Sequence, residues 1–335
     1  MRDRRVIYLA ASCALYLLLW LFAPHVRVPR LLLIALFMLV QLSIPRWLAS
    51  LGIKPKWAAA ALAGALAAWV AVVFAVSARY VPYDTKELGR VPVPIARIRE
   101  RPLPAVMDLP ARQFVRSANG RITSSRPIKV KGYRRPADLS FRLIAFERGA
   151  GRARALTSLL MVLAASAFGC LVSFILREPN ILLPVAGLSA YVDIWTVLLG
   201  PTSFAVEKAP QLVSAVSVAM PAPGGTAAGF GVLSYVGPAD FIFFAMFLAA
   251  AYRLKMEPRR TFWVSLPVLT LGMAAVVSGL FHTGLPALIL IGLSVIVANY
   301  KHFKPTRDEY IAMAIVALIL AAAIAVVTPF VRHGR

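Results

Sequence analysis

Residues 229–252, GFGVLSYVGPADFIFFAMFLAAAY, form a stretch of the chain in which Asp240 is the only charged residue. A run of this length is sufficient to cross the hydrocarbon core of a bilayer, which is about 30 Å thick. A charged side chain near the middle of such a run costs roughly 3 kcal/mol or more, so it is a functional candidate by default. The stretch therefore predicts a membrane-spanning helix with a functional carboxylate about midway along it.

Further apolar runs flank this stretch on both sides, and 60% of the 335 residues are hydrophobic. A soluble protein does not have this composition. Because a lipid-embedded backbone must satisfy its own hydrogen bonds, each run bounded by charges, Pro or Gly predicts a helix. The fold class expected is an all-α polytopic membrane protein with about nine transmembrane helices, at about 6–23, 30–50, 57–79, 155–176, 181–204, 229–252, 261–281, 285–300 and 309–331.

A polar insert, residues 80–154, interrupts the apolar runs. It contains 17 Lys and Arg and 6 Asp and Glu, which excludes it from the membrane interior. A solvated basic loop lying on lipid head groups is favoured over a substrate-recruiting domain, and the alternating residues 128–133 are compatible with a strand. Four regions follow: N-terminal transmembrane helices (1–79), the basic extramembrane insert (80–154), a transmembrane core (155–308), and a C-terminal helix and tail (309–335).

The net charge of +23 does not indicate nucleic acid as a partner. The basic residues lie between apolar spans, where anionic lipid and the bias of basic residues toward the cytoplasmic side account for them. In the C-terminal half they lie on alternate short loops, which predicts a cytoplasmic side for Arg177, Arg253, Lys255, Arg259, Arg260, Lys301, Lys304 and Arg307. The short connections favour a prokaryotic inner membrane.

Of the fourteen acidic residues, only Asp193 and Asp240 fall inside predicted spans. Two carboxylates a few ångströms apart cannot both ionise cheaply, so one stays protonated while the other acts as a base. The base can deprotonate a water that attacks a peptide carbonyl, while the acid donates a hydrogen bond to the carbonyl oxygen. The pair therefore predicts peptide hydrolysis, and neither the two cysteines nor the four histidines have the spacing of a metal site. No cofactor is expected.

Three short motifs accompany the carboxylates: Tyr191-Val192-Asp193, Gly237-Pro238-Ala239-Asp240 and Pro286-Ala287-Leu288. The set resembles the presenilin and signal peptide peptidase family of intramembrane aspartyl proteases. That family has a Tyr-Asp motif in one helix, a Gly-Xaa-Gly-Asp motif in the next, and a Pro-Ala-Leu motif two helices later. The order matches, with 47 residues from the first aspartate to the second and 46 from there to the proline. Alanine stands in place of the second glycine of the family motif, and valine separates the tyrosine from the aspartate.

The resemblance covers about 155–300 and implies a presenilin-like catalytic bundle in the C-terminal half. It implies that the two aspartates are catalytic and that the substrates are transmembrane helices of other membrane proteins. By the predicted orientation, the first catalytic helix runs outward, as in signal peptide peptidases, which act on type II substrates with a cytoplasmic N-terminus. The resemblance assigns supporting or substrate-binding roles to Tyr191, Gly237, Pro238, Ala239, Pro286, Ala287 and Leu288.

Several interpretations remain open from the sequence. Residues 205–228, which join the two catalytic helices, are favoured as a flexible connection; an alternative is a segment that orders against an extended substrate as an added strand. Paired carboxylates also occur in proton- or cation-coupled transporters. A catalytically inactive family member that binds helices is a further alternative. A prepilin-type peptidase is disfavoured, because the chain has no Cys-rich metal-binding segment.

Overall fold

The computed structural model describes residues 2–26, 28–85, 89–94, 112–116, 122–127, 139–199, 210–223, 232–280, 285–316, 318–319 and 322. The chain divides into two compact units, 1–67 with 155–335, and 68–154. It is mostly helical, and by length and composition it is a multi-pass membrane protein. Six of the described helical segments are long and apolar enough to cross a bilayer: Asp3–Phe22, Arg30–Ser50, Pro55–Ser77, Ala153–Ile175, Pro179–Val197 and Pro258–Val277.

The N-terminal helices are α1 (Arg2–Phe22), α2 (Arg30–Ser50) and α3 (Pro55–Ser77), with a 3-10 turn, η1 (Ala23–His25), after α1. Helix α2 packs against α1 and against two C-terminal helices, α11 (Pro238–Arg253) and α12 (Pro258–Val277). Phe37 and Ile44 of α2 are fully buried, and Phe37 meets Tyr16 of α1 edge to face. Helix α2 is therefore a central element of the first unit.

The second unit contains two antiparallel hairpins and a short helix. Strand β1 (Tyr80–Thr85) pairs with β2 (Gly89–Pro94), β3 (Arg112–Arg116) pairs with β4 (Ile122–Pro127), and α6 (Leu139–Gly149) follows. The predicted strand at 128–133 lies outside the described residues. The insert thus contains strands, while the chain as a whole is mostly helical, as expected for an all-α membrane protein.

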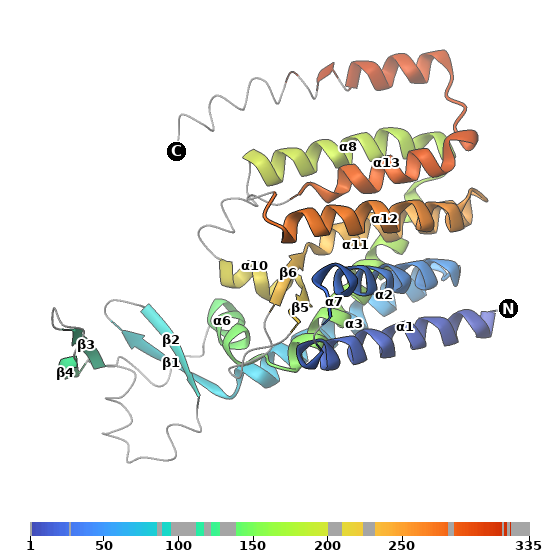
Figure 1. Cartoon of the computed structure of the whole chain (residues 1–335). Helices are drawn as coiled ribbons and strands as arrows, with labels where there is room; N and C mark the ends of the chain where they lie inside the picture. Colours follow the sequence, from blue (N-terminus) through green and yellow to red (C-terminus); the bar gives the residue numbers. More distant parts are fainter. Residues whose placement is uncertain are drawn as a thin grey trace. The chain divides into compact units, whose positions relative to one another are not determined.

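The rest of the first unit begins with α7 (Ala153–Val172), followed by η2 (Ser173–Ile175) and η3 (Pro179–Ile181). Next come α8 (Leu182–Ile194) and a π-helical stretch labelled η4 (Trp195–Leu199), then α10 (Pro210–Val216). After α11 and α12, α13 (Ala287–Asn299) continues into η5 (Tyr300–His302), and a further helix occupies 307–316. Helix α13 packs between α8 and α12, so these three lie side by side (Figure 1).

A third two-stranded sheet is formed by the part of the chain between α8 and α11. Strand β5 (Val218–Pro221) pairs antiparallel with β6 (Val232–Val236). The described part of the 205–228 connection, 210–223, therefore contains a helix and a buried strand. The structure differs here from the favoured interpretation as a flexible connection: 210–216 form a helix, and Val218–Pro221 satisfy their backbone groups by pairing with β6.

Two glycines allow helices to approach closely. A Cβ added at Gly169 of α7 would overlap the carbonyl oxygen of Ile242 in α11. A Cβ added at Gly292 of α13 would lie 3.3 Å from the Cβ of Ala186 in α8. Small residues at such crossings let backbones pack directly, which is how helices associate where lipid offers no hydrophobic driving force. These two contacts hold α7 against α11 and α8 against α13.

The 229–252 stretch is not a single helix as predicted. Strand β6 occupies its first part, and α11 begins only at Pro238. Proline lacks an N–H and its φ is fixed near the helical value, so it is favoured at the first position of a helix. Asp240 consequently lies in the first turn of α11, and Asp193 lies near the end of α8. The prediction that Asp240 lies midway along its helix is wrong.

The basic loops of the C-terminal half meet at one end of the first unit. The Asn180 side-chain amide donates to the carbonyl oxygen of Lys304 (3.2 Å) and accepts from the Lys304 N–H (3.0 Å). The Arg253 guanidinium donates to the carbonyl oxygens of Ser173 and Leu176. These contacts join the loops that follow α7, α11 and α13. Beyond 316, most of the predicted 309–331 helix lies outside the described residues.

Candidate active site

Asp193 caps a helix other than its own. Its Oδ2 accepts a hydrogen bond of 2.8 Å from the backbone N–H of Leu288, the second residue of α13. The first N–H groups of a helix have no partner within that helix, and the helix dipole favours negative charge at this end. Pro286, which precedes α13, has no N–H to donate. The Pro286-Ala287-Leu288 motif thus supplies a helix start that holds Asp193.

Asp240 lies at the start of a helix as well. It occupies the first turn of α11, where Gly237 is the residue before the helix and Pro238 its first member. The Asp240 N–H donates to the Gly237 carbonyl oxygen at 3.2 Å. A Cβ at Gly237 would be 3.6 Å from Oδ2 of Asp240, an ordinary contact. Both carboxylates therefore lie at the positive end of a helix, which lowers the cost of charge at these positions.

The two carboxylates line the same cavity, of about 400 Å³. They come from two separate helices, α8 and α11. Both aspartates are partly buried, so neither is sealed from the cavity. Gly237, Pro238, Ala239 and Ala287 line it with them. Leu288 contributes through its backbone, and its side chain is buried.

Of the motif residues, Tyr191, Val192, Pro286 and Leu288 do not line this cavity. Tyr191 lines a different one, on another face of α8, and Pro286 lines neither. Successive residues of a helix are about 100° apart, so a residue two positions before Asp193 points roughly 200° away from it. The extra Val192 thus turns the tyrosine away from the carboxylates.

Other cavity residues were not predicted from the sequence. Met38 and Leu42 of α2 line one wall, although α2 is distant in sequence and carries no motif. Leu269 and Met273 of α12 line another. Thr196 follows Asp193 by three residues and donates its hydroxyl to the Asp193 carbonyl oxygen (3.2 Å). The spacing of three residues places Thr196 on the same helix face as Asp193, so its presence in the cavity could have been predicted. Nothing in the sequence indicated that α2 lines the cavity.

Comparison with known proteins finds no match. This holds for protein-family models, for curated proteins and for solved structures. The functional argument therefore depends on the motifs and on the cavity.

The chemistry of the site is that of two acids, each at the start of a helix, α11 or α13. In the part of the chain that the structure describes, no three His, Cys, Asp or Glu side chains are grouped so as to hold a metal ion. The Asp193 and Asp240 side chains can divide the roles of proton donor and proton acceptor toward a water molecule between them. The surrounding walls are largely apolar, contributed by side chains such as Met38, Leu269 and Ile291.

Proposed function

We propose that this chain is an intramembrane aspartyl protease, which hydrolyses peptide bonds within transmembrane segments of other membrane proteins. The observation that carries the proposal is that Asp193 and Asp240, from separate helices, line one cavity while the Leu288 N–H donates to Asp193. The resemblance to the presenilin and signal peptide peptidase family links the same three motifs. The family assignment is part of the proposal.

In this mechanism the ionised carboxylate takes a proton from a water molecule as the water attacks the scissile carbonyl. The protonated carboxyl donates a hydrogen bond to the carbonyl oxygen, where negative charge develops. The Leu288 N–H fixes the orientation of the Asp193 carboxylate, which keeps the second oxygen of Asp193 available for the water. The apolar walls limit the entry of bulk water, which strengthens electrostatic interactions inside the cavity.

An extended substrate fits beside β6. This strand runs directly into Gly237 and the turn that carries Asp240, and its residues from Val232 to Ser234 are partly exposed. Its partner β5 is buried, and the Ala219 N–H of β5 donates to the Ser158 hydroxyl of α7 at 3.2 Å. Among the described strands, β6 pairs only with β5. A peptide added as a third strand next to β6 would be extended and would lie close to the carboxylates.

The orientation follows from the basic loops. The loops after α7, α11 and α13 meet at one end of the first unit and carry Arg177, Arg253 and Lys304. We assign this end to the cytoplasmic side of a prokaryotic inner membrane, following the positive-inside bias. Helix α8 then runs outward and α11 inward, so the preferred substrates have a cytoplasmic N-terminus. The nine membrane crossings expected from the sequence belong to this proposal.

The test is cleavage of single-span reporters by purified protein in liposomes. Asp193→Asn and Asp240→Asn each retain side-chain volume and an oxygen that accepts hydrogen bonds, so both variants keep the helix caps and lose only the acid. We expect each to abolish cleavage, while Asp3→Asn, at an exposed acid of α1, cuts like the wild type. Reporters with a cytoplasmic N-terminus should be cut faster than inverted ones. Cleavage that survives in Asp193→Asn or Asp240→Asn contradicts the proposal, and proton flux without any cleavage supports a transporter instead.

A further inference from the structure

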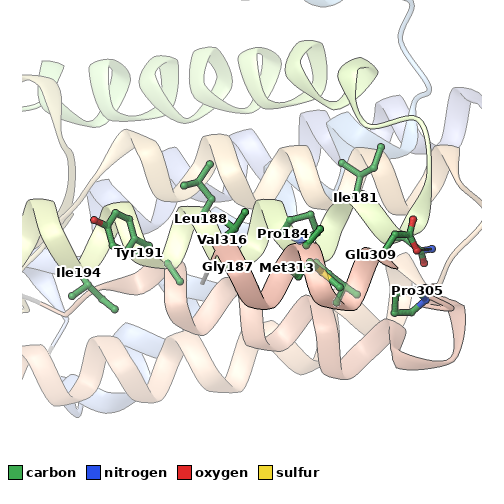
Figure 2. Close-up of a pocket in the computed structure, with 14 residues that line it drawn as sticks. Ile181, Pro184, Gly187, Leu188, Tyr191, Ile194, Pro305, Glu309, Met313 and Val316 are labelled. Atoms are coloured by element: carbon green, nitrogen blue, oxygen red, sulfur yellow. Dashed lines mark hydrogen bonds between the residues drawn. The ribbon is translucent and has the colours of Figure 1, made fainter. Parts of the chain in front are cut away.

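A second cavity lies on the face of α8 away from the carboxylates. It measures about 620 Å³ and is bounded by α8 and by the helix at 307–316. Figure 2 shows Ile181, Pro184, Leu188 and Ile194 along one side, with Met313 among the residues opposite. The lining is apolar along nearly all of its length. We call it the α8 groove.

The α8 groove has one polar end. There the Asn180 side chain donates to Oε2 of Glu309 at 3.2 Å, and Glu309 also accepts from the Thr306 N–H at 2.6 Å. Exposed charges of both signs occur in the segments that form this end: Arg177, Glu178, Lys301, Lys304, Arg307 and Asp308. The opposite end, at Tyr191 and Ile194, has no charged residue in its lining. The groove therefore begins at a charged rim and ends at an apolar floor.

We propose that the α8 groove binds one acyl chain of a zwitterionic phospholipid, with the headgroup at the Asn180 rim. From Asn180 to Ile194 the helix rises about 20 Å, which takes an acyl chain from the membrane surface to about mid-bilayer. Glu309 lines the rim, and the segments next to it carry Lys304 and Arg307, whose charge suits a phosphate, and Asp308, whose charge suits an ammonium group. The mixture of signs favours a zwitterionic headgroup over a purely anionic one.

The groove falls within the range of sites for single small molecules, roughly 300–1,000 Å³. Its floor at Tyr191 and Ile194 flanks Asp193 on α8 without entering the carboxylate cavity. Lipid binding here is a separate property from peptide hydrolysis.

Gly187 provides a way to fill the groove. It lines the groove, and a Cβ built on it meets nothing within 4 Å. Gly187→Phe therefore places a ring in the space of the acyl chain without a backbone clash at Cβ. Gly64 of α3 has the same open surroundings and is exposed, so Gly64→Phe is the matched control.

The first measurement is native mass spectrometry of the full chain, released from nanodiscs that contain equal amounts of phosphatidylethanolamine and phosphatidylglycerol. We expect the wild type and Gly64→Phe to retain one phosphatidylethanolamine that Gly187→Phe has largely lost. Using Asp193→Asn as the parent makes the result independent of proteolysis. Equal retention by Gly187→Phe, or preferential retention of phosphatidylglycerol, overturns the proposal.

The second measurement needs no groove variant, so a folding defect in Gly187→Phe cannot decide the outcome. Phosphatidylethanolamine with a diazirine at the acyl terminus should cross-link to the wild type at Tyr191 and Ile194. A diazirine close to the ester should instead label the segment around Ile181 and Pro184. The reverse pattern, or labelling spread evenly over the apolar surface, overturns the proposed orientation or the site.

Discussion

Gly292 sets the distance between α13 and α8, and therefore the hydrogen bond that holds Asp193. It lies one turn after Leu288 on the same face of α13. A Cβ at this position would be 3.3 Å from the Cβ and 3.4 Å from the carbonyl oxygen of Ala186. Favourable contacts between carbon atoms begin at roughly 3.5–4.0 Å. Replacement of Gly292 by alanine must therefore separate the helices by a few tenths of an ångström, and the larger valine must separate them further.

The effect on Asp193 follows from the bond length. The Leu288 N···Oδ2 distance is 2.8 Å, and N–H···O bonds lie within about 2.7–3.2 Å. Gly292→Ala should stretch the bond toward the upper limit, while Gly292→Val should break it. A hydrogen bond to a charged group contributes about 1.5–3 kcal/mol. If the bond is needed in the transition state, Gly292→Val should slow cleavage by about 10- to 150-fold.

The assay is the initial rate of reporter cleavage in liposomes, with protein amount and thermal unfolding measured on the same samples. The double variant Ala186→Gly with Gly292→Ala moves the methyl group from one helix to the other and should recover most of the rate lost in Gly292→Ala. Gly64→Val controls for a β-branched side chain introduced into a helix. Wild-type rates in Gly292→Val, or a methyl exchange that fails to restore cleavage, would refute the proposed link between helix spacing and Asp193.

Three further changes test other parts of the structure. Gly169→Leu forces a side chain into the carbonyl oxygen of Ile242, so we expect the unfolding free energy to fall by about 3 kcal/mol; equal melting of Gly169→Leu and Gly64→Leu would contradict the close approach. Ala239→Gly removes a methyl group from the cavity wall and makes the start of α11 more flexible. We therefore expect equal or faster cleavage and a slightly lower melting temperature. A tenfold slower rate of cleavage would count against this. Deletion of 211–219 removes part of β5 and should abolish cleavage, while the helicity measured by circular dichroism should persist. Undiminished cleavage would exclude a role of this sheet in substrate binding.

Long apolar segments were predictable because lipid leaves the backbone no partner except itself. The helical segments Arg30–Ser50 and Pro55–Ser77 match the expected 30–50 and 57–79 closely. The end of a strand within a predicted span was harder to predict, because the residues of β6 are as apolar as those of a membrane-spanning helix. Gly237-Pro238 was the available signal for the start of α11, because proline favours the first position of a helix.

The site was predictable in its carboxylates and only partly in its walls. Asp193 and Asp240 stand out because charge is rare in apolar spans, and α13 follows them in the expected order. The contribution of Met38 depends on how α2 packs against α11 and α12, which no local pattern encodes. The orientation of Tyr191 could be predicted from helical geometry, because a residue two positions before Asp193 points to the opposite side of the helix.

The broken spans and the paired acids have a common physical cause. A continuous helix has no unsatisfied N–H groups in its middle, so a carboxylate there would lack donors and would be unfavourable in an apolar setting. The breaks before α11 and α13 create helix starts within otherwise apolar stretches. Asp240 lies in the first turn of one, and Asp193 accepts the Leu288 N–H at the other. Gly237-Pro238, at the start of α11, and Pro286, immediately before α13, therefore define the helix starts whose positive ends allow two acids to face one cavity.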